Sequence, residues 1–288
     1  MAAFPLMEGV VEPVQLTSEE LSELRRAKWI LEHPSLAIRM TNLLGVPIEK
    51  GFKLLPKGCA KLVHRSVRAA LFQTLKAATL SLGSHQQTPS SDRFHKIIVG
   101  TSGAVAGTFG FASLPVELPL STAAMLRSIA DIARSEGHRL SDLETQLACL
   151  EVFALGGRPP GPRDQENQYW IIRAGLARAI SEASTYLANR GIVNETAPAI
   201  VRLIAAIAGR FGVIVSEQIA AKAVPLVGAA SSSAINLIFM GHFQRMARGH
   251  FTVKRLEKKY GAQEIEDLYR SIPVPLPPKD RESTRPVH

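Results

Sequence analysis

Two stretches of the chain decide the fold: residues 97–126, IIVGTSGAVAGTFGFASLPVELPLSTAAML, and residues 223–244, AVPLVGAASSSAINLIFMGHFQ. Both are poor in charge and rich in Gly, Ala and Ser, and the first has no charged residue from Ile97 to Val116. Small side chains let helix backbones approach each other closely, which favours packing of helix on helix. We therefore expect the two stretches to form a central pair of apolar helices in an all-α protein.

Regularly spaced glycines give the first stretch a packing face. Gly100, Gly103, Gly107 and Gly110 follow one another at intervals of three or four residues, so a helix places them on one side. Each glycine inside a helix costs about 1 kcal/mol relative to alanine, and close contact with a second helix offsets that cost. Gly228 begins a complementary surface on the second stretch. We predict that these glycines are helix-packing positions.

The first stretch also has the length of a membrane span, for which about 20 apolar residues suffice. However, Pro115, Pro119 and Pro225 lie inside or beside the two stretches, and Thr, Ser and Gly stand where a spanning helix carries Leu and Ile. This pattern favours a buried hairpin in a soluble or peripheral bundle over a spanning pair.

Helical patterns continue on both sides of the two stretches. Thr17 and Glu20 predict a capping box at the start of a first helix, which Pro34 stops. Ser141 and Glu144 predict a second capping box. The helix of the first stretch is expected to continue to about residue 135. Further helices are expected at about residues 57–82, 141–155, 165–189, 198–221, 253–260 and 263–271.

These patterns predict a single multi-helix bundle, because no useful length of alternating residues indicates a sheet. Residues 1–16 are expected to be a flexible N-terminus, and residues 17–271 one helical domain with a weak internal linker at 156–164. Residues 272–288 contain five prolines and are expected to be a disordered tail.

The formal net charge of +9 favours anionic partners. Two cysteines, Cys59 and Cys149, exclude a disulfide framework and fit a reducing compartment. The N-terminus lacks a basic region and soon reaches Glu8 and Glu12, which is not typical of a secretory signal. We expect a cytoplasmic protein.

A basic stripe is the second functional signal, with no acidic residue from Lys50 to Ser91. Cations recur there at intervals of three or four residues, opposite an apolar helix side, and this pattern suits an anionic membrane surface. The alternative is a solvated face over a core helix. The predicted contact residues are Lys53, Lys57, Lys61, Arg65 and Arg68. A second basic group near the C-terminus repeats the pattern and comprises Arg245, Arg248, Lys254, Arg255, Lys258 and Lys259.

Polar residues embedded in the apolar stretches form a candidate cluster. Glu117 stands in the first turn of a helix, where the helix dipole favours a carboxylate. Arg127 and Asp131 are four residues apart and are expected to pair. Lys222 and Asn236 flank or enter the second stretch. If the two stretches pack together, these residues meet in a polar patch that fixes the helix register or contacts a ligand.

The sequence contains no Walker A loop, HExxH, GxSxG or dinucleotide-binding motif, and we predict no catalytic residue, metal or cofactor. His242 and His250 are eight residues apart without a neighbouring Cys or carboxylate, which makes a metal site less favoured than a structural role. The sequence thus leans towards a protein that is not an enzyme.

Three groups of motifs resemble the EcsC family, and the similarity runs from about Ser18 to Ile272. They are Gly100, Gly107 and Gly110 with LPVELP (114–119) and MLRSIADIA (125–133), KAVPLVGA (222–229) with Ile235, Asn236 and Phe239, and His250-Phe251 with RLEKKYG (255–261). Trp29, Gly45 and Leu55-Pro56 also match family positions. The resemblance implies that residues 17–271 are an EcsC-like domain. It also implies a bacterial accessory role at the membrane, linked to ABC transport, because the family is named for a protein encoded beside such a transporter.

The leading hypothesis is a membrane-associated accessory protein, peripheral at the inner membrane or partly inserting. Its expected partners are an anionic membrane surface and, through the resemblance, membrane transport machinery. One alternative is a soluble helical module that binds an acidic partner protein, and another is a lipid-directed or other hydrolase. Nucleic acid is less favoured, because no known binding module or clustered aromatic residues accompany the charge.

Overall fold

The computed structural model describes residues 15–33, 36, 40–42, 45, 48–79, 114–157, 167–223 and 229–273, and their side chains except those of 229–233. Within these ranges every regular element is a helix and there is no strand, which confirms the predicted all-α class. The helices are α1 (Ser18–Glu32), α3 (Ile48–Lys53), α4 (Cys59–Ala77), α6 (Leu114–Ser135), α7 (Leu143–Glu151), the 3-10 turn η3 (Val152–Ala154), α8 (Gln168–Arg190), α9 (Pro198–Lys222), α10 (Ala229–Tyr260) and α11 (Ala262–Ser271).

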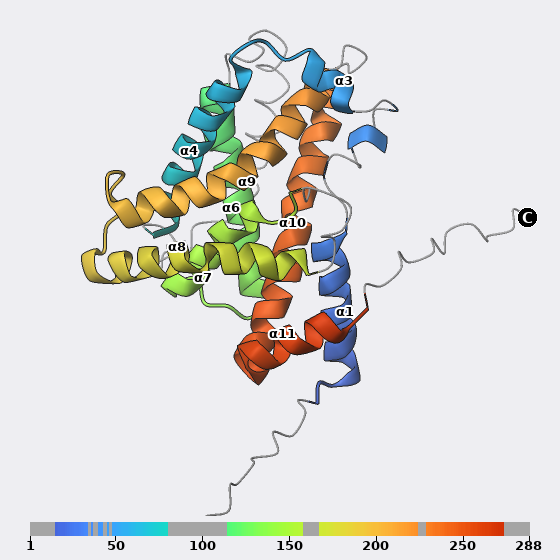
Figure 1. Ribbon diagram of the computed structural model, residues 1–288, viewed down its shortest axis with the longest axis vertical. Helices are drawn as coiled ribbons and strands as arrows, with labels where there is room; N and C mark the ends of the chain where they lie inside the picture. The colour runs from blue at the N-terminus through green and yellow to red at the C-terminus, as the bar shows by residue number, and fades with distance from the viewer. Residues whose placement is uncertain are drawn as a thin grey trace, which may run out of the picture.

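Helix α10 runs along the long axis of the molecule, and the other helices pack around it (Figure 1). Helix α1 lies beside its lower half, while α6 and α9 contact it from the other side. Helix α4 packs on α6 and α9, and α3 packs on the C-terminal part of α9 at the upper end of the molecule. We call this upper end the α3 end.

The start of α1 shows how local sequence sets a helix boundary. The backbone N–H of Thr17 donates to Oε2 of Glu20 at 3.0 Å, and the N–H of Glu20 donates to the Thr17 hydroxyl at 3.2 Å. This confirms the predicted capping box, which satisfies backbone donors that a helix start leaves open.

The second predicted capping box is wrong. Helix α7 begins at Leu143 with Asp142 at its N-cap, and no side chain bonds to the open backbone donors. The Ser141 hydroxyl lies one residue too early and donates to the Asp142 carboxylate at 3.3 Å instead.

The expectation of a separate basic helix at 253–260 is also wrong, because α10 continues unbroken for 32 residues. Gly249 does not interrupt it. A Cβ at this position would lie 2.9 Å from Cγ of Leu31 on α1, so the glycine allows close packing of the two helices.

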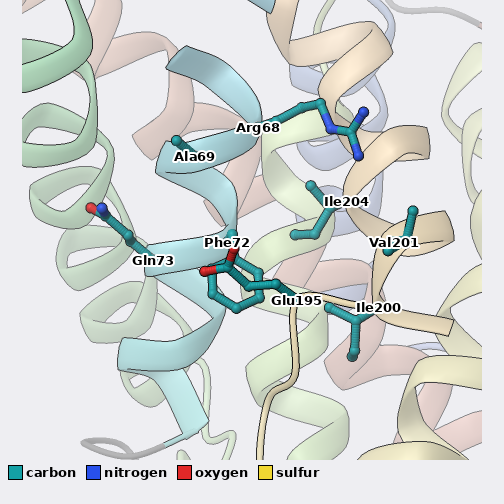
Figure 2. A pocket seen from close by; sticks show the side chains of 8 residues that line it. All are labelled: Arg68, Ala69, Phe72, Gln73, Glu195, Ile200, Val201 and Ile204. Atoms are coloured by element: carbon teal, nitrogen blue, oxygen red, sulfur yellow. The ribbon is translucent and has the colours of Figure 1, made fainter. Parts of the chain in front are cut away.

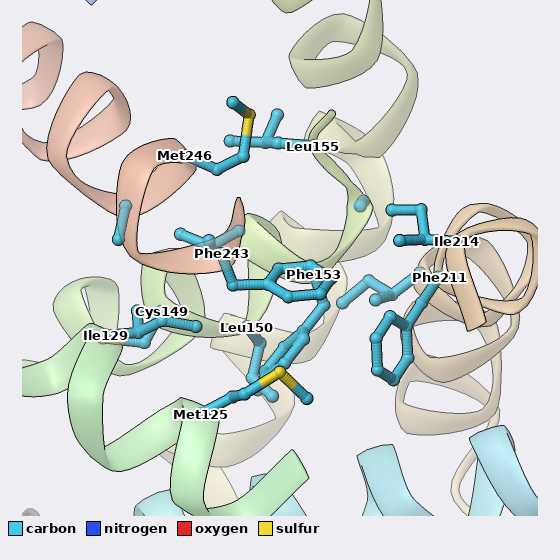
Figure 3. Close-up of a cluster of buried hydrophobic side chains, with 14 of the residues drawn as sticks. Met125, Ile129, Cys149, Leu150, Phe153, Leu155, Phe211, Ile214, Phe243 and Met246 are labelled. Atoms are coloured by element: carbon cyan, nitrogen blue, oxygen red, sulfur yellow. The ribbon is translucent and has the colours of Figure 1, made fainter. Parts of the chain in front are cut away.

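Three phenylalanines from different elements form the centre of the core (Figure 3). Phe153 of η3, Phe211 of α9 and Phe243 of α10 are fully buried, with ring centroids 5.0 to 5.6 Å apart. Such tilted and edge-on contacts are favourable beyond the area they bury, by about 0.5–1.5 kcal/mol for each pair. The core therefore joins η3 and α9, in the middle of the chain, to α10.

Candidate functional site

The predicted basic stripe lies on α3, the following turn and α4. Lys53 ends α3, Lys57 stands in the turn, and Lys61 begins the part of the stripe on α4. The residue spacing predicted one continuous helix side, but Pro56 and the left-handed Gly58 (φ +90°) separate two helices here. The stripe therefore spans two elements.

All five cations of the stripe are exposed, and none makes an ion pair with any residue that the structure describes. The other side of α4 is buried through Val67, Leu71 and Leu75, each fully inaccessible. Glu49 is the one acid between residues 48 and 79, and it too is exposed. We call this surface the basic face; its residues are Lys53, Lys57, Lys61, Arg65 and Arg68.

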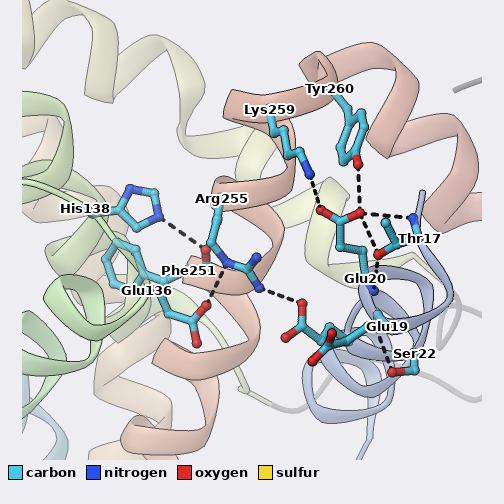
Figure 4. Close-up of polar contacts among 11 residues, drawn as sticks. Thr17, Glu19, Glu20, Ser22, Glu136, His138, Phe251, Arg255, Lys259 and Tyr260 are labelled. Carbon is cyan, nitrogen blue, oxygen red and sulfur yellow. Dashed lines mark hydrogen bonds and ion pairs between the residues drawn. The ribbon is translucent and has the colours of Figure 1, made fainter. Parts of the chain in front are cut away.

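Three cations of the second basic group are paired with acids of the protein, and Figure 4 shows the contacts of Arg255 and Lys259. Lys254 lies 3.0 Å from Glu144, and the Arg255 guanidinium bridges Glu23 at 2.7 Å and Glu136 at 3.1 Å. Lys259 Nζ donates to Glu20 at 2.6 Å. Acids of α1, of the turn after α6 and of α7 therefore face these three cations.

Glu20 gives a pH-dependent contribution to stability. Hydrogen bonds from Lys259 and Tyr260 lower its pKa from 4.5 to about 2. Because folding lowers this pKa, the contribution is present above about pH 4.5 and is lost as the pH falls towards 2.

We expect Glu20→Gln to lower stability at neutral pH, and the difference from wild type to shrink between pH 4.5 and 2. Urea midpoints measured across this range check it. Glu19→Gln, on the same helix turn but exposed and without a side-chain contact among the described residues, is the matched control. A difference in stability between Glu20→Gln and wild type that stays constant with pH would contradict the pH-dependent contribution of Glu20.

A hollow of about 280 Å³ borders the basic face between α4 and the first part of α9 (Figure 2). Its lining residues are Arg68, Ala69, Phe72, Gln73, Glu195, Ile200, Val201 and Ile204. The buried side chains of Ile200 and Ile204 give it an apolar floor, while Arg68 and Glu195 are exposed at its rim without pairing with each other. The hollow belongs to the same surface as the basic stripe.

The structure brings together part of the predicted polar cluster. Lys222 Nζ of α9 donates to Oε1 of Glu117 on α6 at 2.9 Å. One turn earlier on α9, Gln218 donates to Oδ1 of Asn236 on α10 at 3.0 Å. These two contacts tie α9 to helices on both sides.

The other two members of the predicted cluster lie apart from these contacts. Arg127 and Asp131 are exposed on α6, and Asp131 makes an ion pair with Arg134 at 3.0 Å. The predicted packing glycines Gly100, Gly103, Gly107, Gly110 and Gly228 lie outside the described residues, and so does Pro225.

A buried polar network that the sequence did not predict joins α7, α8 and α10. The Tyr169 hydroxyl lies 3.0 Å from Nδ1 of His250, whose Nε2 is 3.6 Å from Glu151. Arg173 binds Glu257 through two hydrogen bonds and stacks over the Trp170 ring at 4.7 Å.

Burial shifts the protonation of this network. It raises the pKa values of the Tyr169 hydroxyl and the Glu151 carboxyl, and it lowers the pKa of His250 well below its usual range. Tyr169, Glu151 and His250 are almost inaccessible, with exposed fractions of 1, 4 and 0%. The network is therefore placed to hold helices together. Among the described residues, no group of His, Cys, Asp and Glu has the arrangement of a metal site.

The comparison with protein families assigns most of the chain to one group. The model of the EcsC protein family matches residues 18–256. The chain belongs to the EcsC family. No curated protein and no solved structure matched it.

The EcsC match begins at the first residue of α1 and ends in the last turns of α10. It therefore includes the basic face, the contact between Glu117 and Lys222, and the buried network except Glu257. Only α11, of the described helices, lies outside it.

One described helix of this EcsC protein, α9, is long and apolar enough to cross a membrane, with a mean hydropathy of 1.9 over its best window. It differs from the stretches that the sequence singled out. A single such helix is weak evidence for a span, because a core helix passes the same test. Helices α3, α4, α8 and α10 all pack on α9.

Proposed function

We propose that this EcsC protein is a membrane-associated accessory protein that binds anionic membrane surfaces through its basic face. The observation that carries the proposal is the contrast between the basic face and three cations of the second basic group. Acids of neighbouring helices neutralise Lys254, Arg255 and Lys259, whereas the cations on α3 and α4 are exposed and have no acidic partner among the described residues. Their positive field is therefore directed outward.

The number of cations on the basic face sets the strength of membrane binding that we expect. Each Lys or Arg near an anionic bilayer contributes about 1 kcal/mol, and the contribution falls within a Debye length of about 8–10 Å. The five cations of the basic face would together hold the protein reversibly at a surface. We place that surface at the cytoplasmic side of the inner membrane, where family association suggests transport machinery as a neighbour.

Charge reversal on α4 and its preceding turn tests the proposal. We expect the triple variant Lys57→Glu, Lys61→Glu, Arg65→Glu to bind anionic liposomes at least about 100-fold more weakly, because it loses roughly 3 kcal/mol of attraction and adds the repulsion of three carboxylates. Flotation at low salt, with vesicles of phosphatidylglycerol and phosphatidylcholine, measures the bound fraction.

The control is Arg25→Glu, Arg26→Glu, Arg248→Glu, which changes the net charge equally at exposed positions of α1 and α10. It should bind nearly as wild type. Equal losses in both variants would show a dependence on net charge alone and would overturn the role of the basic face. Failure of the wild-type protein to float at low salt would overturn membrane binding itself and would favour an acidic protein as the partner.

A further inference from the structure

Helix α3 is held rigidly against α9 by an unusually close backbone contact. A Cβ added at Gly51 would lie 1.9 Å from the carbonyl oxygen of Ala220, so only glycine fits. Ile48, three residues earlier, is also buried, with 3% of its surface exposed. The short helix therefore has one fixed side, and the direction of its remaining side chains is set by α9.

Two large apolar side chains on and just after this helix are exposed. Phe52 is 41% exposed and Leu54 is 51% exposed, although both stand within three residues of the buried contact. Exposed lysines surround them in the segment KGFKLLPK, at Lys50, Lys53 and Lys57. Apolar side chains interleaved with cations are the pattern of a segment that lies in a membrane interface.

Single exposed apolar residues are common on soluble proteins, so exposure alone does not distinguish Phe52 and Leu54 from other exposed apolar residues of this molecule. Val116 and Leu120 on α6 are exposed by 65 and 51%, but they flank Glu117. Leu237 on α10 is 68% exposed, and no lysine or arginine lies within seven residues of it in the sequence. Among these sites, Phe52 and Leu54 have the charge that complements an anionic surface.

We propose that α3 and the turn after it form a membrane anchor, in which Phe52 and Leu54 enter the acyl region of an anionic bilayer. The proposal rests on the proposed function, since it names the part of the basic face that penetrates. Lys50, Lys53 and Lys57 then remain among the lipid phosphates. The anchor gives the protein an orientation, with the α3 end at the membrane and α11 away from it (Figure 1).

Fluorescence with brominated lipids tests penetration directly. Phe52→Trp places a reporter in the anchor, and vesicles of phosphatidylglycerol with bromine on the acyl chains quench a tryptophan that enters the bilayer. We expect clear extra quenching and a blue shift relative to the wild-type protein, whose Trp29 and Trp170 supply the background. The matched control is Ile192→Trp, which replaces a 66% exposed isoleucine before the start of α9, at the end of that helix away from its contact with α3, and should show no extra quenching.

A binding measurement accompanies the spectra. We expect the double variant Phe52→Ser, Leu54→Ser to float at low salt but to bind about tenfold more weakly than wild type near 0.15 M salt, where charge attraction is screened. Its far-UV spectrum and urea midpoint should match those of wild type, because both side chains are exposed.

The outcomes separate the two proposals. If Phe52→Trp floats without extra quenching, or the double variant keeps wild-type binding near 0.15 M salt, the anchor is overturned while surface binding stands. If the wild-type protein does not float at any salt concentration, the proposed function fails first.

Discussion

Replacing Arg173 with methionine is expected to lower the free energy of unfolding by about 3–5 kcal/mol, the usual cost of breaking a buried ion pair from one side. The guanidinium donates to Glu257 through its two terminal nitrogens, from Nη2 at 3.2 Å, and its Nε lies 3.9 Å from Glu151. The side chains of the two acids are only 9 and 5% exposed. Methionine would fill much of the volume over Trp170 but would leave Glu257 without its cation.

Urea denaturation followed by circular dichroism measures this effect. Arg178→Met is the control on the same helix, because its ion pair with Glu182 is solvent-exposed and worth about 0–1 kcal/mol. Adding Glu257→Gln to Arg173→Met should recover part of the lost stability, since the unpaired charge is removed. A loss in Arg173→Met no larger than that in Arg178→Met would show that the buried pair does not hold α8 to α10.

Replacing Lys28 with methionine should cost about 3 kcal/mol or more, because two hydrogen bonds from a charged donor are lost, each worth about 1.5–3 kcal/mol. The amine of this buried lysine donates to the carbonyl oxygens of Tyr269 at 2.7 Å and Ile272 at 2.6 Å. These carbonyls belong to the C-terminal end of α11, which a helix leaves without internal partners. Methionine cannot satisfy them.

Hydrogen exchange gives this variant a specific readout. Amides of α11 should lose protection in Lys28→Met before those of α9 do, and the urea midpoint should fall. Arg25→Met, on the same helix but exposed, should change neither measurement. Unchanged protection of α11 in Lys28→Met would contradict the role of the buried amine.

The sequence predicted elements well where local signals decide them. Thr17 and Glu20 satisfy each other within one turn, and Pro198 begins α9 at a position where its missing N–H is harmless. The same kind of signal failed at Ser141, because a Ser-x-x-Glu spacing does not determine which residue becomes the N-cap. The interruption of the basic stripe at Pro56 and Gly58 was readable in principle, but the regular spacing of the cations obscured it.

The sequence likewise predicted some contacts of the candidate site and missed others. Glu117 and Lys222 were expected to meet because both interrupt apolar surroundings, and the structure joins them across 105 positions of sequence. Periodicity shows which residues share a helix face, but it does not show which other helix that face meets. Periodicity therefore could not predict the contacts of Tyr169 with His250 and of Lys28 with Ile272. The alternation of lysine with Phe52 and Leu54 was the available sign of an exposed interfacial segment.

Because α10 is unbroken, it can transmit a force applied near one of its ends to the other. With a rise of about 1.5 Å per residue, its 32 residues form one rod of roughly 48 Å. Asn236 near one end is bonded to α9, and Lys259 at the other end is bonded to α1. A force applied where α3 meets a bilayer would therefore reach the opposite end of the protein without a hinge to absorb it.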